Sequence, residues 1–276
     1  MAKEFNLTER DFQTIKKLVV EHTGICLSDA KHDMIYSRLA KRLRQLDLTS
    51  FSDYLALLTA DDGDEIGNFI NSVTTNLTSF FREQHHFDFL KENLIPRLVK
   101  ENSDTRVIRL WSAGCSTGEE PYSLAMMFKE CVPDNQGWDV RILATDLDTN
   151  VLATASQGVY ALDRVNGIPQ DKLKRWFYRG KGASEGKVKV SSELRDMISF
   201  KQLNLMGKWP VKPGVDIIFC RNVVIYFDKD TQKILFDRYA NTLKLGGYLF
   251  IGHSETLYNV STRFNLLGKT IYQRAE

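Results

Sequence analysis

The sequence predicts an α/β fold with a mostly parallel sheet, preceded by an all-α N-terminal domain. From residue 106 onward, apolar runs of strand length alternate with segments of helical periodicity, which is typical of a parallel sheet with helices on both faces. Before residue 105, no alternating strand pattern occurs. The 276 residues, 43% of them hydrophobic and 26% charged, are enough for one large or two smaller compact domains.

The composition excludes several classes of protein. The 37 basic and 35 acidic residues leave a net charge of +2, which is too low for a surface that binds nucleic acid broadly. No apolar run approaches the ~18 residues of a membrane span, and the N-terminus lacks a signal-peptide pattern. We therefore expect no membrane insertion and a cytoplasmic location. The four cysteines lie far apart, which argues against a zinc ribbon or a disulfide framework.

Helical periodicity predicts an N-terminal helical domain over residues 1–76. Thr8 and Asp11 resemble a capping box ahead of an apolar stripe that ends at Gly24. Further helices are expected over 51–59 and 64–75.

The second expected helix has an uneven charge distribution. Its apolar stripe runs from Met34 to Leu46, and its basic strip consists of Arg38, Lys41, Arg42 and Arg44. Residues 47–65, in contrast, carry six acidic residues and no basic one. A basic strip of this kind is, by itself, more often a solvated helix face than a binding surface.

The α/β half begins with a strand, a glycine loop and a helix. An apolar strand over 107–112 leads into Gly114 and Gly118, and a helix is expected over 119–128. Later strands are expected over 140–144, 216–220 and 248–251. Ligands of such sheets bind at the carboxyl ends of the strands.

One segment interrupts the alternation of strands and helices. Residues 174–179 and 187–190 flank three glycines and predict a β-hairpin, beside which residues 197–202 could pair. We therefore expect a small antiparallel β insertion over about 172–202.

The glycine loop is the first indication of a ligand. Gly114 and Gly118 allow a sharp turn, and the following helix offers free N–H groups. The spacing differs from that of dinucleotide enzymes, and Glu119 and Glu120 stand where a pyrophosphate would need neutral or positive surroundings. These acids suit a cationic ligand such as S-adenosylmethionine. The alternative is a plain strand-to-helix turn.

Polar residues also follow the later strands. Asp146 ends one strand and suits ribose hydroxyls, whereas Asn204-Leu205 and Asn222-Val223 can present amide and backbone groups to an adenine. Each of these is also a common turn residue. Their joint placement at successive strand ends favours a nucleotide-like ligand.

The segment 77–90 joins the two halves and is richer in polar and aromatic side chains than a linker requires. Adjacent His85 and His86 point apart on a helix and lack an evident third ligand, so no metal site is predicted. The segment Gly252-His-Ser-Glu255 lacks the second glycine of a nucleophile elbow, which excludes that type of hydrolase.

Four motifs, in order, carry a resemblance that covers essentially the whole chain. They are Thr-Thr-Asn-Leu-Thr-Ser-Phe-Phe-Arg-Glu from residue 74, Trp-Ser-Ala-Gly-Cys-Ser-Thr-Gly-Glu-Glu-Pro-Tyr-Ser from residue 111, Cys-Arg-Asn-Val-Val-Ile-Tyr-Phe from residue 220, and Gly-His-Ser-Glu from residue 252. Together they closely resemble the CheR family of chemotaxis-receptor glutamate O-methyltransferases. The resemblance implies a Rossmann-like class I methyltransferase domain over 91–276 that uses S-adenosylmethionine.

The resemblance assigns roles to individual residues. Arg82 is expected to orient cofactor and acceptor, and Tyr226 to line the methyl-transfer site. With Gly114 from the glycine loop, the expected cofactor-binding positions are Asn76, Thr78, Arg82, Glu120, Asp146, Asn204, Leu205, Asn222 and Val223.

The resemblance also implies partners. The cytoplasmic signalling domain of chemoreceptors would be the substrate, with its acidic methylation helices facing the basic strip. In some members the β insertion binds a C-terminal receptor peptide, here through Arg179, Gly180 and Gly182. Lys189 stands where the family pattern leads us to expect arginine, and a lysine makes no bidentate contact with a carboxylate. The family generally works as a monomer.

Two alternatives compete with this interpretation. The first is a methyltransferase that acts on another substrate, because such an enzyme could use the same cofactor-binding domain. The second is a non-catalytic signalling module that binds the cofactor or a peptide.

Overall fold

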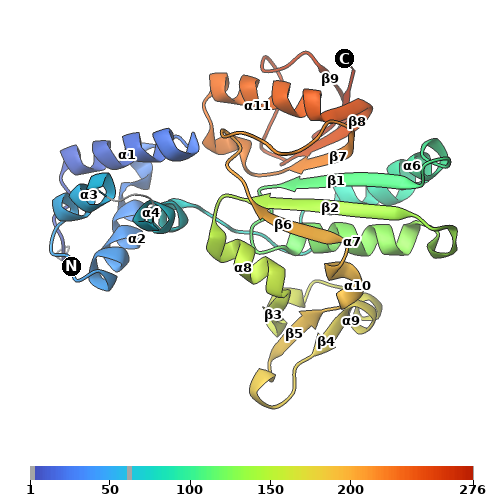
Figure 1. The fold of residues 1–276 in the computed structure, drawn as a ribbon, viewed down its shortest axis with the longest axis horizontal. Coiled ribbons are helices and arrows are strands. Elements are labelled where there is room, and N and C mark those ends of the chain that lie inside the picture. The colour runs from blue at the N-terminus through green and yellow to red at the C-terminus, as the bar shows by residue number, and fades with distance from the viewer. Residues whose placement is uncertain (1–3, 61–63, 276) are drawn as a thin grey trace.

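The computed structural model describes residues 4–60 and 64–275. A group of helices at the N-terminus stands beside a larger α/β domain, and a short linker joins the two (Figure 1). Within the described residues, no helix has the length and apolar character that crossing a membrane requires.

The N-terminal helices follow the predicted pattern. They are α1 (Glu9–Thr23), α2 (His32–Gln45), α3 (Phe51–Ala60) and α4 (Asp64–Val73), with a single 3₁₀ turn, η1 (Asp29–Lys31), before α2. The capping box at Thr8 and Asp11 is confirmed, and α1 ends at Gly24, whose φ of 75° is left-handed. Their apolar stripes meet in one core, which includes Phe12, Leu39 and Phe69.

The α/β domain contains the predicted, mostly parallel sheet. Its strands are β1 (Val107–Ala113), β2 (Asp139–Asp146), β6 (Ile198–Gln202), β7 (Val215–Cys220), β8 (Leu243–Ile251), β9 (Phe264–Gly268) and β10 (Ile271–Arg274). Their order is β6-β2-β1-β7-β8-β10-β9. The first five strands in this order are parallel to one another, and β10 pairs antiparallel with both β8 and β9.

Helices cover both faces of this sheet, as predicted (Figure 1). The principal ones are α5 (Gln84–Phe89), α6 (Ile95–Glu101), α7 (Glu119–Cys131), α8 (Thr149–Gln157) and α11 (Lys229–Thr242), with a π-helical turn, η2 (Leu90–Leu94), between α5 and α6. Because strand side chains alternate, Leu110 packs in the core with α5–α7, whereas the adjacent Trp111 packs in the core with α11.

The small antiparallel sheet is present, but its composition differs from the prediction. It consists of β3 (Val159–Ala161), β5 (Lys187–Val190) and β4 (Phe177–Arg179), with β5 in the centre. The expected hairpin is therefore confirmed, but residues 174–176 belong to α9 (Gln170–Trp176). Placing 197–202 beside the hairpin was wrong, because after α10 (Ser192–Arg195) the chain returns to the main sheet and β6 pairs in parallel with β2.

Candidate active site

A cavity of about 450 Å³ lies at the carboxyl ends of the central strands. The sheet domain, the linker and the N-terminal helices all contribute to its walls. Eleven residues expected to bind the cofactor or act in catalysis line this one cavity: Asn76, Thr78, Arg82, Gly114, Glu120, Asp146, Asn204, Leu205, Asn222, Val223 and Tyr226. The structure thus brings together positions that lie up to 150 residues apart in the chain (226 − 76 = 150).

The glycine loop approaches the 222–223 segment closely. Gly114 has a φ of 86°, and a Cβ placed on it would lie 2.4 Å from Cγ2 of Val223. Another residue at this position would therefore be strained and would also push the loop off the opposite wall of the cavity.

Asp146 is held at the end of β2 by backbone groups. Its carboxylate accepts hydrogen bonds from the N–H groups of Ser116 (2.8 Å) and Asp148 (3.0 Å). Burial raises the pKa of Asp146, whereas these N–H bonds oppose that rise. Each carboxylate oxygen has a second lone pair, so the side chain can still accept hydrogen bonds from hydroxyl groups in the cavity.

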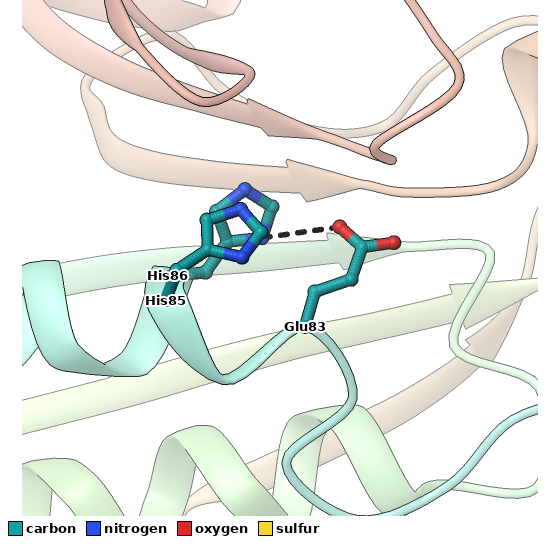
Figure 2. A group of neighbouring side chains, drawn as sticks. All are labelled: Glu83, His85 and His86. Carbon is teal, nitrogen blue, oxygen red and sulfur yellow. Dashed lines mark ion pairs between the residues drawn. The ribbon is translucent and has the colours of Figure 1, made fainter.

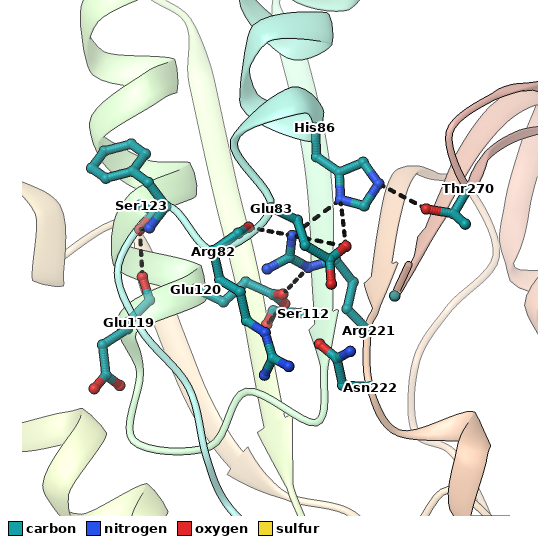
Figure 3. A network of polar contacts seen from close by, with 12 residues as sticks. Arg82, Glu83, His86, Ser112, Glu119, Glu120, Ser123, Arg221, Asn222 and Thr270 are labelled. Carbon is teal, nitrogen blue, oxygen red and sulfur yellow. Dashed lines mark hydrogen bonds and ion pairs between the residues drawn. The ribbon is translucent and has the colours of Figure 1, made fainter. Parts of the chain in front are cut away.

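The two acids of the glycine loop have different surroundings. Glu120 lines the cavity and accepts hydrogen bonds from Ser112 Oγ (2.7 Å) and Arg221 Nε (2.8 Å). Glu119 is fully buried, is bonded by Thr117 Oγ1 and Arg164, and is absent from the cavity wall. Only Glu120 therefore faces a ligand, and it does so as half of a buried ion pair. Figure 3 shows this pair.

The linker is fastened to the rim of the sheet. Asn76 Nδ2 donates to Asp148 Oδ2 (2.7 Å), and its carbonyl accepts from Ser116 Oγ (2.8 Å). Arg82 donates from Nη1 to the Leu77 carbonyl (2.8 Å). These contacts place Asn76 and Arg82 on the cavity wall.

Glu255 supports the cavity wall, a role that its motif in the sequence does not indicate. Its carboxylate accepts from the N–H groups of Asn222 (3.0 Å), Ile225 (3.3 Å) and Gly252 (2.5 Å). It thereby fixes the 222–225 turn, in which Asn222 has a positive φ of 59°. A Cβ at Gly252 would lie 2.5 Å from Asn222 Nδ2, which explains the glycine of this motif.

The N-terminal helices complete the cavity. The Cys26 N–H donates to the Tyr226 carbonyl (2.8 Å), and residues between Thr23 and Met34 line the wall. Asn204 Nδ2 donates to the His22 carbonyl (2.7 Å), and its Oδ1 accepts from the Met206 N–H (2.9 Å). One N–H of this amide and one lone pair of its oxygen remain for a ligand, so the expectation that Asn204 presents its amide to an adenine stays a prediction.

Glu83, His85 and His86 bring potential metal ligands within 4.8 Å of one another (Figure 2). His86 Nδ1 lies 3.0 Å from Nη1 of Arg221 and must accept that bond, since a guanidinium only donates. His86 Nε2 then carries the proton and lies 3.1 Å from Thr270 Oγ1. Both ring nitrogens are thus engaged beside a fixed cation, an arrangement unsuited to a metal ion.

Some residues of the basic strip on α2 form hydrogen bonds within the helical domain. Arg42 donates from Nε to Glu65 Oε1 (2.7 Å), and Tyr54 bonds the same carboxylate. Arg38 Nη1 donates to the carbonyls of Val73 and Thr74. The expectation of four receptor-facing cations is corrected for Arg38 and Arg42, which bind groups within the helical domain. Lys41 and Arg44 are exposed, and Arg44 Nε donates to Glu4 Oε2 (3.0 Å).

The expected peptide-binding residues lie on the small sheet. Arg179 is exposed at the end of β4, an edge strand, and Lys189 is exposed on the central strand β5. A Cβ at Gly180 would lie 2.0 Å from the Ser184 carbonyl oxygen, and Gly182 has a φ of 57°. The turn alone therefore accounts for both glycines.

Comparisons with known proteins cover nearly the whole chain. Residues 76–273 match the family model described as the SAM binding domain of CheR methyltransferase, and residues 10–74 match its all-alpha domain. The chain is 43% identical to chemotaxis protein methyltransferase 2 of Pseudomonas aeruginosa, over 99% of this chain and 96% of that protein. It is also 43% identical to the chemotaxis protein methyltransferase of Escherichia coli, over 99% of this chain and 93% of that protein.

Proposed function

Because this chain belongs to the CheR methyltransferase family, whose cofactor is S-adenosylmethionine, we propose that it methylates glutamate side chains of bacterial chemoreceptors. The products would be a glutamate methyl ester and S-adenosylhomocysteine, and the ester would serve sensory adaptation.

The cavity suits this cofactor in size and in chemistry. Its volume of about 450 Å³ lies within the usual range for small-molecule sites. Asp146 offers a carboxylate to hydroxyl groups, and Glu120 offers one to a cation. When bound, S-adenosylmethionine supplies an electrophilic methyl group on a positively charged sulfur. The groups that would hold it are Asn76, Thr78, Arg82, Glu120, Asp146, Asn222, Val223 and the backbone of Asn204-Leu205.

The acids and bases of the cavity support the proposal of a carboxylate acceptor. Among the described residues that line the cavity there is no histidine, the carboxylates are Glu120 and Asp146, and the other titratable side chains include Cys26, Lys31 and Tyr226. Both already accept hydrogen bonds from protein groups. An alcohol, or an amine that is protonated at neutral pH, would need a base to remove its proton, whereas glutamate, with a reference pKa of ~4.3, is already an anion.

Arg82 and Tyr226 are the residues proposed to act at the acceptor. Of the guanidinium nitrogens of Arg82, Nη1 donates to a carbonyl in the described part of the chain, and the rest of the guanidinium is available to an anion. Tyr226 lines the same cavity, where its phenol can donate a hydrogen bond. Their task would be to align the carboxylate oxygen, because correct alignment alone supplies several kcal/mol.

Methyl transfer to receptor-rich membranes tests the proposal. Incubation with methyl-labelled S-adenosylmethionine should place label on a chemoreceptor as an ester that base releases. Arg82→Ala should retain the fold and lose most of this transfer. Label on nucleic acid or a small molecule, or normal transfer by Arg82→Ala, would contradict the proposal.

We further propose that Lys41, Arg44 and the β4 edge contact the receptor. Both α2 cations are exposed, and β4 can accept an added strand. Calorimetry with C-terminal receptor peptides should show heat that Arg179→Ala abolishes. If no peptide gives heat, the tether does not exist, and the catalytic proposal is unaffected.

A further inference from the structure

Arg221 is a buried arginine beside the cavity for which the sequence suggested no role. It follows the last residue of β7, and only 3% of its side chain is exposed. The guanidinium carbon lies 5.8 Å from the ring centre of Phe87 and 5.7 Å from that of Phe219. An arginine buried in this way is stable only where its charge and its N–H groups are satisfied.

Three chain segments meet at this guanidinium (Figure 3). Nε donates to Glu120 Oε2 at the start of α7, over 2.8 Å. Nη1 donates to the Arg82 carbonyl of the linker over 2.6 Å, and it lies 3.0 Å from His86 Nδ1 in α5. The guanidinium group is planar and rigid, so the directions of its N–H groups are fixed. It therefore also fixes the positions of these segments relative to β7.

The same contacts act on the charge of Glu120. One oxygen of this carboxylate accepts from Ser112 and the other from Arg221. Without the arginine, Glu120 would be a buried carboxylate with no cation beside it, and such charges are strongly unfavourable. Arg221 therefore supplies the positive charge beside Glu120 and points its carboxylate in one direction.

The bond to the Arg82 carbonyl stabilises an unusual stretch of backbone. Phe81 and Glu83, on either side of Arg82, have positive φ values of 53° and 59°. Non-glycine residues adopt this conformation at a cost of roughly 1 kcal/mol or more each, so the surroundings must hold it. The hydrogen bond from Arg221 is made to the residue between Phe81 and Glu83, and it fixes the position of the Arg82 backbone from which that side chain extends.

From these contacts we propose that Arg221 is a positioning residue for methyl transfer. It acts through Glu120, whose carboxylate it orients toward the cofactor, and through Arg82, whose backbone it holds at the cavity wall. This inference rests on the proposed function, and the tests below need no receptor.

Arg221→Lys is the informative variant, because it keeps the positive charge and removes the planar guanidinium group with its fixed N–H directions. We expect S-adenosylhomocysteine to bind roughly tenfold more weakly in calorimetry. Arg109→Lys is the matched control, since Arg109 bonds Asp139 near the amino end of β1, away from the cavity. The control makes the same substitution at an arginine–carboxylate pair that is more exposed and lies away from the cavity, and it should change the affinity by less than about twofold.

A spectroscopic readout shows whether the network itself has changed. In the wild type, ¹⁵N spectra should show His86 with its proton on Nε2, and Arg221→Lys should change these ring signals while Arg109→Lys leaves them unchanged. If Arg221→Lys is folded, shows altered His86 signals and binds S-adenosylhomocysteine as the wild type does, Arg221 has no positioning role.

A wild-type measurement covers the case in which Arg221→Lys does not fold. Saturation with S-adenosylhomocysteine should shift the Arg221 Nε resonance and leave that of Arg109 in place. An unmoved Arg221 signal would overturn the inference. Conversely, an unmethylated receptor together with weakened binding by Arg221→Lys would refute only the proposed substrate.

Discussion

His86 is buried between Arg221 and the turn that joins β9 to β10, where it contacts Lys269 and Thr270. Burial first, and then the positive charges of Arg221 and His85, lower its pKa to about 3, against the opposing effect of Glu83. The imidazole is therefore neutral in the folded protein at pH values where an exposed histidine takes up a proton.

This low pKa predicts a loss of stability in mild acid. Below the unfolded pKa of ~6.5, the unfolded chain binds a proton that folded His86 does not bind, so the free energy of unfolding falls as the pH decreases. Between about pH 7.5 and about pH 5.5, this contribution amounts to about 1.4 kcal/mol. Urea unfolding at the two pH values measures it.

His86→Gln is the variant that isolates the effect, because glutamine can accept from Arg221 and donate to the β9–β10 turn without titrating. Its free energy of unfolding should fall by about 1.4 kcal/mol less over the same interval. An equal fall in both proteins would mean that His86 titrates alike in the folded and unfolded states.

The sequence predicts that a residue lies in the cavity wall where that residue stands at the carboxyl end of a strand. Asp146 and Asn222 are of this kind, since the carboxyl ends of parallel strands meet at one edge. The engagement of Asn204, Arg38 and Arg42 by other protein groups was not predictable. Each has a hydrogen-bond partner in another segment, 23 to 182 residues away in the chain, and the spacing of residues in the sequence does not reveal such a partner.

At the scale of elements, one aspartate joins a helix to the linker. Asp148 Oδ1 caps α8 by accepting from the Asn150 N–H (2.8 Å). Its Oδ2 accepts from Thr74 Oγ1 (2.8 Å) and Asn76 Nδ2 (2.7 Å). The start of α8 and the linker therefore depend on the same side chain.

Asp148→Ala should lower both stability and affinity for S-adenosylhomocysteine. Loss of the N-cap costs about 1 kcal/mol, and release of Asn76 should weaken binding severalfold because the linker forms part of the cavity wall. Thr8→Ala is the control, since it removes the N-cap of α1 away from the cavity. Calorimetry and urea unfolding compare the two, and unchanged binding by Asp148→Ala would show that the linker docks without it.

The misplaced strand β6 shows the limit of sequence patterns at this scale. Residues 198–202 alternate as a strand does, and alternation indicates a half-buried strand without naming its partner. The short helix α10 turns the chain back, and β6 then finds an open edge at β2. A four-residue helix is too short to be recognised from periodicity.

At the scale of the whole molecule, the cavity belongs to neither domain alone. Residues of the N-terminal helices, the linker and the sheet all line it, and the Cys26 N–H bonds the Tyr226 carbonyl across the domains. A ligand that fills this cavity contacts both parts, so its binding should oppose their separation.

Hydrogen exchange measures this coupling. At S-adenosylhomocysteine concentrations of about 100 times its Kd, the bound state gains about 2.7 kcal/mol, so exchange that requires opening of the site should slow by up to about 100-fold. Residues 23–31 and 74–82 should both show slowing, and the β4–β5 hairpin should not. Protection confined to the sheet domain would contradict a cavity shared by two domains.

The sequence by itself determined the two-part organisation and the parallel sheet, and its family motifs gave the cofactor and eleven of the residues that line the cavity. The sheet follows from local periodicity, and strand ends bring short motifs to one edge whatever the rest of the chain does. Only the tertiary structure decided which polar side chains remain free for ligands. Arg221, Glu255 and Arg42 have their partners in distant segments, and a buried charge is defined by those partners rather than by its neighbours in the chain.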